Sequence, residues 1–448
     1  MESADLKARS PWATLNDIKS VEIRPANEPI DRDITIPGSK SFTNRALIIA
    51  ALAKGPSTLS GILRSDDSYW CIETLKAMGV AIQLKDNQVH IEGTGGRWPI
   101  QKGKLYIGAA GTIARFLPGA LAACDQGEWV VEASDRMSER PVKPLIDALT
   151  SMGADIRYQS TDGAYPLHIK ASGLVGGKVS ISGKISSQFI SGLLIAAPYA
   201  RKPVTIRVID PIVQHAYVHI TLDLMKRFGA DVSYDQDLTA LKVAPLHYKG
   251  QTIQLEADAS TACYFMALAA LTNGKVRINH LTDQTKQPDI KMIDLLERMG
   301  CSVVKGRTFI EIKGAKRLKG GFEVSMKEMS DQALTLAAIA PFADGPIKIT
   351  DIGHIRHHES DRIHVIAQSM TRLGIQAIEH EDGVTIYPGN PKPAVLSSYD
   401  DHRVAMSLSL IGTRVPGIKI ANPGCVSKTC PSYFDLLRHF GIDCRFEK

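Results

Sequence analysis

Aromatic residues, long apolar runs and regularly spaced cysteines are scarce in this chain, and each shortage excludes a class of protein. Phe, Trp and Tyr make up 6% of the 448 residues, and no stripe of Lys and Arg with interleaved aromatics occurs, which argues against a nucleic-acid-binding surface. No apolar run approaches the roughly 18–20 residues of a membrane-spanning helix. The first twenty residues lack the apolar stretch of a secretion signal, so we expect a cytoplasmic protein.

The seven cysteines are odd in number and scattered, which is typical of reduced thiols. Cys425 and Cys430 have no second pair at zinc-ligand spacing, so no metal site is expected. The net charge of +6 is spread along the chain. It therefore favours a small anionic ligand in a few cationic pockets over a long polyanion.

The strongest feature present is a repeated pattern. In each repeat the apolar stripe of a helix ends at a glycine, and a short apolar stretch follows. The pattern recurs at intervals of 74, 76, 71, 74 and 67 residues, which is too long for common solenoid repeats. Each repeat must hold several elements, such as strands over 35–37, 130–132 and 204–208 and helices over 44–53 and 187–197. A chain of this length exceeds one core, so two domains of three units are predicted. The six glycines are Gly79, Gly153, Gly229, Gly300, Gly374 and Gly441.

Eight polar segments interrupt the repeats and carry the candidate chemistry. Most lie where an apolar helix begins, and backbone N–H groups at a helix start attract anions. Taken singly, each segment could equally be a helix cap or a solvated loop. Adjacent His357 and His358 do not suit a shared metal. The segments are 37–45 (PGSKSFTNR), 108–115 (GAAGTIAR), 135–141 (DRMSERP), 186–188 (SSQ), 329–332 (MSDQ), 354–362 (HIRHHESDR), 399–403 (YDDHR) and 425–431 (CVSKTCP).

In order and spacing, the eight segments together resemble the 5-enolpyruvylshikimate-3-phosphate synthase family of enolpyruvyl transferases, from about Val21 to the C-terminus. The resemblance implies an α/β fold, a two-domain inside-out α/β barrel with six βαβαββ repeats, three per domain. It places one domain at 34–257 and the other at 1–33 plus 258–448, with hinges near Asp33 and Asp258. The active site would lie in the cleft between the domains.

The resemblance also implies a reaction of the shikimate pathway, which leads to chorismate and aromatic amino acids. The enolpyruvyl group of phosphoenolpyruvate moves to the 5-hydroxyl of shikimate 3-phosphate through a tetrahedral intermediate, and phosphate leaves. Asp331 would be the base for the hydroxyl, while Glu359 and Lys40 would form the acid/base pair at the enolpyruvyl carbon. Because Glu359 lies among cations, we expect a lowered pKa, so that acting as an acid would require burial.

By position, the resemblance assigns binding residues for both substrates and implies no cofactor, no metal and a monomeric protein. Its partners would be these two small molecules, without nucleic acid or membrane. The phosphoenolpyruvate residues would be Lys40, Gly111, Arg140, Gln188, Arg362, Arg403 and Lys428. The shikimate 3-phosphate residues would be Ser41, Arg45, Ser186, Ser187, Gln188, Tyr217, Asp331, His354 and His358.

Several positions depart from the family pattern: Ala109, Phe116, Gln214 to Ala216, His354 and His358. Phe116 stands where a proline is usual and could shift the start of its helix. We therefore predict reduced sensitivity to glyphosate, which inhibits this family at the phosphoenolpyruvate site. His358 replaces a frequent lysine, either as a neutral donor or, when protonated, as a cation. The cationic form predicts a steeper loss of activity at alkaline pH than in a lysine-bearing relative.

Two alternatives remain open. The sister transferase that acts on UDP-N-acetylglucosamine shares the fold, but it typically carries Lys-Asn in the first segment and a loop cysteine as general acid. Lys40-Ser41 and the 186–188 segment favour shikimate 3-phosphate instead. A non-catalytic anion-binding protein of the same fold is the other alternative. The presence of Asp331 and Glu359 among the cations argues against it, because carboxylates weaken the binding of anions.

Overall fold

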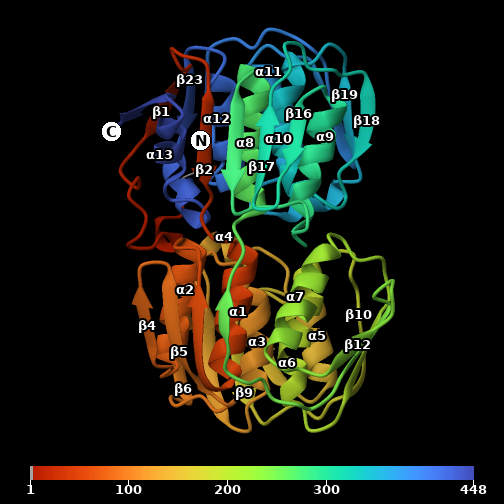
Figure 1. Ribbon diagram of the computed structural model, residues 1–448. Helices are drawn as coiled ribbons and strands as arrows, with labels where there is room; N and C mark the ends of the chain where they lie inside the picture. The colour runs from red at the N-terminus through yellow and green to blue at the C-terminus, as the bar shows by residue number, and fades with distance from the viewer. Residues whose placement is uncertain (1–3) are drawn as a thin grey trace. The chain divides into compact units, whose positions relative to one another are not determined.

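The computed structural model of the protein describes residues 4–448, and the chain divides into two compact units (Figure 1). The first unit joins the N-terminal part up to Pro37 to the stretch Glu256–Lys448. The second unit is Gly38–Leu255. None of the helices over residues 4–448 has both the length and the apolar character that a membrane crossing requires.

The second unit contains three four-stranded sheets with one shared topology. In each sheet the first two strands are parallel and the other two pairings are antiparallel. The strand orders are β14-β3-β5-β4, β6-β7-β9-β8 and β10-β11-β13-β12. The strands are β3 (Lys54–Ser60), β4 (Ile82–Lys85), β5 (Gln88–Thr94), β6 (Lys102–Tyr106), β7 (Gly127–Glu132), β8 (Asp155–Tyr158), β9 (Leu167–Ala171), β10 (Gly177–Ile181), β11 (Val204–Val208), β12 (Val232–Tyr234), β13 (Ala240–Val243) and β14 (Thr252–Gln254).

The first unit repeats this topology three times. Its sheets have the orders β2-β15-β17-β16, β18-β19-β21-β20 and β22-β23-β1-β24, so the N-terminal strand β1 completes the last sheet. The strands are β1 (Ser20–Arg24), β2 (Asp31–Thr35), β15 (Lys275–Asn279), β16 (Ser302–Lys305), β17 (Phe309–Lys313), β18 (Phe322–Ser325), β19 (Ile347–Thr350), β20 (Ala377–His380), β21 (Gly383–Ile386), β22 (Ala394–Ser397), β23 (Ile418–Ala421) and β24 (Asp443–Glu447).

Helices fill the inside of each unit, because several of them are apolar on every side and must be covered all round. In the second unit α3 and α6 are buried along almost their whole length, as are α8, α10 and α12 in the first. Figure 1 shows α8, α10 and α12 side by side within the first unit. The sheets bury alternate residues of their strands, as in β9 and β11. The inside-out α/β fold with six repeats is confirmed.

The helices fall between the sheet strands in chain order. In the second unit they are α1 (Lys40–Leu52), α2 (Asp66–Ala77), α3 (Ile113–Ala122), α4 (Asp135–Ser138), α5 (Lys143–Ser151), α6 (Ser187–Ala196), η2 (Ala197–Tyr199) and α7 (Ala216–Arg227). In the first unit they are η1 (Leu6–Ala8), α8 (Ala259–Thr272), η3 (Pro288–Lys291), α9 (Met292–Arg298), η4 (Ser330–Gln332), α10 (Ala333–Ile339), η5 (Ala340–Phe342), η6 (Gly353–His357), α11 (Arg362–Arg372), α12 (His402–Gly412), η7 (Pro423–Lys428) and α13 (Tyr433–His439).

The six repeat glycines lie where the sequence pattern predicts a change from helix to strand. Each follows one of the helices α2, α5, α7, α9, α11 and α13 and precedes a strand. All six have φ between 73° and 96°, a region that favours glycine because it has no Cβ.

Some predicted boundaries are wrong. The strand expected over 35–37 is Asp31–Thr35, since Pro37 has no N–H to donate to a sheet and its carbonyl instead accepts from the N–H of Asp258. The helix expected over 44–53 begins at Lys40, and the helix expected to end at residue 197 ends at Ala196, where η2 begins. The strand over 204–208 is confirmed, and the strand over 130–132 begins earlier, at Gly127.

Candidate active site

Asp331 in the first unit is held by two arginines. Its Oδ1 accepts a hydrogen bond from Nη1 of Arg362 at 2.8 Å, and its Oδ2 lies 3.1 Å from Nη2 of Arg403. The N-caps of η4 and α10 are Met329 and Gln332, so the interpretation of Asp331 as a helix cap is wrong. Asp331 is instead a charged acceptor between two cations.

Asp401, at the start of α12, contacts the side chain of Arg362 and the backbone of Arg403. Its carboxylate receives a fork of two hydrogen bonds from Arg362, Nε at 2.8 Å and Nη2 at 3.1 Å, and it caps α12 by accepting from the N–H of Arg403. Burial acts to raise the pKa of Asp401, but the charge of Arg362 outweighs it and holds the pKa below its usual range. Planar, doubly hydrogen-bonded pairing of this kind restricts the arginine to one orientation.

Glu359 lies between His402 and Lys428. Its Oε2 is 2.7 Å from Nδ1 of His402, and its Oε1 is 3.2 Å from Nζ of Lys428. Burial acts to raise the pKa of Glu359, but the charges of His402, Lys428 and Arg362 together hold it well below the usual range. The lowered pKa agrees with the expectation from the surrounding cations, and the side chain is 12% exposed, so the burial that an acid role would require is present.

We refer to Asp331, Glu359, Arg362, Asp401, His402, Arg403 and Lys428 as the carboxylate–cation cluster. Glu359, Asp401 and His402 each present a ligand atom within 4.8 Å of the others, a spacing that a metal ion could use. Arg362 and Lys428 already bind the two carboxylates. A divalent cation would have to displace both, so we interpret the group as an ion-pair network.

His354 and His358 lie beside this cluster, with their rings 5.8 Å apart. Nε2 of His354 is 2.7 Å from Oγ of Ser330, and burial lowers the pKa of His354. Nδ1 of His358 is 3.1 Å from Nη1 of Arg362. The same ring nitrogen lies 3.7 Å from Oδ1 of Asp331. Both roles named for His358, neutral donor and cation, stay predictions, as does the loss of activity at alkaline pH.

Gly111 in the second unit lies beside two arginines. Its carbonyl accepts from Nη1 of Arg115 at 3.2 Å, and a Cβ added to it would lie 2.9 Å from Nη1 of Arg140. Burial, followed by repulsion from Arg140, lowers the pKa of Arg115. The guanidinium groups of Arg115 and Arg140 lie beside Gly111, which has no side chain to block access. This arrangement favours the binding of an anion.

Lys40 begins α1 and lies 3.5 Å from Oδ2 of Asp67, which is almost fully buried near the start of α2. Asn44, one turn further along α1, donates to Oγ1 of Thr112 at 2.7 Å, just before α3. The starts of α1, α2 and α3 therefore meet in the second unit. Lys40 and Gly111 belong to the same corner of this unit.

Arg45 is buried among neutral oxygens. It donates to Oγ1 of Thr221 at 2.7 Å and to the carbonyl of Ser41 at 3.0 Å, and its guanidinium lies 4.9 Å above the ring of Phe116. Burial lowers the pKa of Arg45 to about 10. No ion pair between Arg45 and a carboxylate occurs within residues 4–448. A buried cation whose hydrogen-bond partners are all neutral is strongly stabilised when an anion binds next to it.

Three further predicted residues lie at the start of α6. Oγ of Ser186 accepts from the N–H of Gln188 at 3.2 Å, so Ser186 is the N-cap of α6. This agrees with the interpretation of the 186–188 segment as a helix cap. Ser187 is buried and Gln188 half-buried. Tyr217 lies in α7, and its carbonyl is 3.4 Å from Nη2 of Arg45.

The sequence interpretation missed several residues of these clusters. Asp67, Arg115, Asp401, His402 and Thr221 all contact predicted residues, although none was assigned a role. Asp401 and His402 lie in the 399–403 segment, directly before Arg403, and that adjacency was the available signal.

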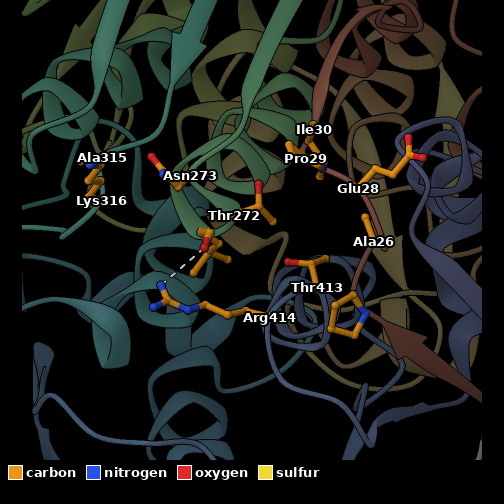
Figure 2. A pocket seen from close by; sticks show the side chains of 12 residues that line it. Ala26, Glu28, Pro29, Ile30, Thr272, Asn273, Ala315, Lys316, Thr413 and Arg414 are labelled. Carbon is orange, nitrogen blue, oxygen red and sulfur yellow. Dashed lines mark hydrogen bonds between the residues drawn. The ribbon is translucent and has the colours of Figure 1, made fainter.

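A separate pocket of about 350 Å³ in the first unit is shown in Figure 2. Glu28, Asn273 and Arg414 are among its lining residues, and Arg414 donates to the carbonyl of Leu271 at 3.4 Å. None of its lining residues is a predicted site residue.

Comparison with known proteins agrees with the resemblance. The profile of the EPSP synthase (3-phosphoshikimate 1-carboxyvinyltransferase) family matches residues 25–437. A 3-phosphoshikimate 1-carboxyvinyltransferase 2 from Halalkalibacterium halodurans is 60% identical, with 100% of both chains aligned, and a 3-phosphoshikimate 1-carboxyvinyltransferase from Trichormus variabilis is 40% identical over 93% of this chain and 97% of its own. The structure of EPSP synthase from Acinetobacter baumannii has a TM-score of 0.82 at 27% identity, covering 96% of this chain and 100% of that one. This chain belongs to the EPSP synthase family.

Proposed function

We propose that this protein transfers the enolpyruvyl group of phosphoenolpyruvate to the 5-hydroxyl of shikimate 3-phosphate and releases phosphate, in the shikimate pathway. The observation that carries the proposal is the carboxylate–cation cluster, in which Asp331 and Glu359 are each held by two cationic or imidazole partners. Addition followed by elimination needs both a base and an acid, and two differently placed carboxylates supply them. Membership of the family supports the same reaction.

The cations account for the charge of the substrates. Together the two substrates bring about five negative charges close to each other, which repel unless cations are already fixed in place. We assign phosphoenolpyruvate to Arg362, Arg403 and Lys428 of the first unit. Lys40, Arg140, Gln188 and the backbone of Gly111 would contribute from the second. The proposal therefore requires both units to act on the same substrates.

Shikimate 3-phosphate is assigned to the remaining predicted residues. Arg45 supports this assignment, because its described partners are neutral oxygens and an anionic substrate would supply the missing negative charge. The hydroxyl of Ser186 already accepts a backbone N–H but can still donate to a ligand oxygen. The full assigned set is Ser41, Arg45, Ser186, Ser187, Gln188, Tyr217, Asp331, His354 and His358.

Proton transfer is assigned to Asp331, Glu359 and Lys40. Asp331 is the base for the 5-hydroxyl, and its side chain is 15% exposed, which leaves it accessible to a ligand. Glu359 and Lys40 exchange the proton at the methylene carbon. In the absence of substrates Glu359 is ionised, and two anionic substrates next to Lys428 and Arg362 would offset these cations and raise its affinity for a proton.

A competition assay tests the acceptor. Phosphate release from phosphoenolpyruvate is measured with shikimate 3-phosphate, with UDP-N-acetylglucosamine, or with both. We expect release with shikimate 3-phosphate alone and no slowing by the nucleotide sugar. Release with UDP-N-acetylglucosamine alone would favour the sister transferase, and binding of both anions without release would favour a non-catalytic protein.

We also propose that the protein is a monomer and is located in the cytoplasm. Its two domains would be 34–257 and 1–33 plus 258–448, with hinges near Asp33 and Asp258. Light scattering during size-exclusion chromatography measures the molar mass directly. A mass near that of one chain, 48.7 kDa, is expected, and a mass of twice this value would contradict it.

A further inference from the structure

The N-terminal segment, residues 5–19, lies outside the stretch matched by the family profile and yet contacts Asp400, next to Asp401, and the chain at η7, which ends at Lys428. Asp400, which directly precedes the cluster residue Asp401, receives two of these contacts. Its Oδ2 accepts from the backbone N–H of Asp5 at 3.0 Å, and its Oδ1 forms an ion pair with Arg9. The side chains of Arg9 and Asp400 are 6% and 16% exposed, so this pair is largely shielded from water.

The backbone around Asp400 needs such support. Tyr399 and Asp400 both have φ of 52°, a left-handed conformation that non-glycine residues rarely adopt. Two such residues in succession persist only where the surroundings fix them. Nδ2 of Asn422 also donates to Oδ1 of Asp400 at 2.9 Å, and the N–H of Asp400 is 3.3 Å from Oγ of Ser398.

The turn leads directly into Asp401 and Arg403 and so bears on the position of Arg362, which Asp401 holds. Directly after Asp400, Asp401 caps α12 and holds Arg362 by two hydrogen bonds, while Arg403 lies in the first turn of α12. A change in the turn would therefore move the carboxylate that orients Arg362. Asp400 itself contacts neither arginine in any described hydrogen bond or ion pair.

The same N-terminal segment reaches the segment that carries Lys428. The carbonyl of Lys19 accepts from the N–H of Asn422 at 2.8 Å, just before η7. A Cβ added to Gly424, within η7, would lie 2.8 Å from the carbonyl oxygen of Leu15. The N-terminal segment is thus packed directly on the helix that ends at Lys428.

We propose that Arg9 is a positioning residue for phosphoenolpyruvate binding. Through Asp400 it stabilises the left-handed turn at Tyr399 and Asp400, and thereby the orientation of Asp401, Arg362 and Arg403. The proposal rests on the assignment of these arginines to phosphoenolpyruvate. It adds a requirement for a segment that the family profile does not include.

Steady-state kinetics of four single variants of the full chain test this. Arg9→Gln removes the charge, and Arg9→Lys retains it. Asp400→Asn removes the partner charge while tolerating the left-handed backbone, and Asp17→Asn removes an exposed charge from the same segment. We expect Arg9→Gln and Asp400→Asn each to lower kcat/KM for phosphoenolpyruvate by about tenfold, mostly through KM. The KM for shikimate 3-phosphate should change much less.

Rescue and coupling distinguish positioning from general destabilisation. Arg9→Lys should recover most of the activity, and Asp17→Asn should match the unchanged protein. The double variant of Arg9→Gln with Asp400→Asn should lose no more activity than either single variant. The proposal is overturned if Arg9→Gln stays within twofold of the unchanged protein, or if both KM values rise equally and Arg9→Lys does not rescue. An Arg362→Gln variant with full activity would instead contradict the assigned phosphoenolpyruvate residues, whatever Arg9 does.

Discussion

Glu359 shows how burial and charge oppose each other at a single carboxyl group. The side chain is 12% exposed, yet His402 and Lys428 keep it ionised. Because its pKa is lowered in the folded protein, Glu359 contributes stability that is present above about pH 4.5 and is lost as the pH falls. The same carboxylate can take part in proton transfer only when substrate charge changes this balance.

Replacing Glu359 by Gln should therefore impair catalysis far more than binding. The amide keeps the size of the side chain and an oxygen for Lys428, but it cannot exchange a proton. We expect kcat to fall roughly 10²–10⁴-fold with little change in either KM, measured by phosphate release. Glu381→Gln, on an exposed residue, is the matched control. A Glu359→Gln enzyme with nearly normal kcat would remove Glu359 from the mechanism.

For Asp289 we predict the opposite dependence of stability on pH. It is buried, accepts from Nε2 of Gln332 at 2.9 Å, and burial raises its pKa to about 6 although Arg403 opposes the rise. A raised pKa means that the stability contributed by the protonated form is lost as the pH rises from about 4 through 6. Asp289→Asn does not titrate, so its stability relative to the unchanged protein should increase over this range by about 1–3 kcal/mol.

Denaturant unfolding at pH 4.5 and pH 7.5 measures this difference for Asp289→Asn. Asp294→Asn, on the exposed side of α9, is the control for replacing a carboxylate by an amide. If the difference in stability between Asp289→Asn and the unchanged protein were the same at both pH values, Asp289 would be ionised over this whole pH range, held by Arg403.

Gly111 leads to a prediction about substrate binding. In Gly111→Ala the new Cβ would lie 2.9 Å from Nη1 of Arg140, so the guanidinium must move away. Displacing one charge-assisted contact should raise the KM for phosphoenolpyruvate roughly tenfold and leave that for shikimate 3-phosphate nearly unchanged. Gly103→Ala, whose Cβ meets nothing within 4 Å, controls for the added methyl group. Unchanged kinetics in Gly111→Ala would argue that Arg140 does not bind phosphoenolpyruvate.

At the scale of elements, helix α3 connects the departures from the family pattern to the site. Phe116 is fully buried in α3, and its ring lies beneath Arg45, while Gly111 and Thr112 precede the same helix. We therefore keep the prediction of reduced glyphosate sensitivity. The ratio of the glyphosate inhibition constant to the KM for phosphoenolpyruvate should be larger than in a relative with proline at this position. An equal ratio, measured at equal saturation, would contradict it.

The helix-to-strand units could be predicted because glycine is favoured at positive φ, and this requirement is visible in the sequence. Partners distant in sequence could not be predicted in the same way. Asp67 meets Lys40, and Asp401 meets Arg362, across 27 and 39 residues of chain. These pairs depend on how sheets and helices bring the chain together. A lowered pKa for Glu359 is expected from the cations in the sequence, but its actual partners, His402 and Lys428, are brought to it only by folding.

At the scale of the whole molecule, the assigned residues are divided between the two units, and this division is itself testable. The fragment Gly38–Leu255 contains three complete sheets and their buried helices. We expect it to fold cooperatively by circular dichroism but to release no phosphate, because Asp331, Glu359 and Arg362 are missing. Catalysis by this fragment would show that the carboxylate–cation cluster is dispensable.

The reaction itself is the central claim, and phosphorus NMR of the complete enzyme tests it most directly. With phosphoenolpyruvate and shikimate 3-phosphate present, we predict that the phosphoenolpyruvate signal is replaced by inorganic phosphate in equal amount. The phosphate ester of shikimate 3-phosphate should persist, slightly shifted by the new enolpyruvyl ether. Release of phosphate without shikimate 3-phosphate, or loss of its ester phosphate, would contradict the account.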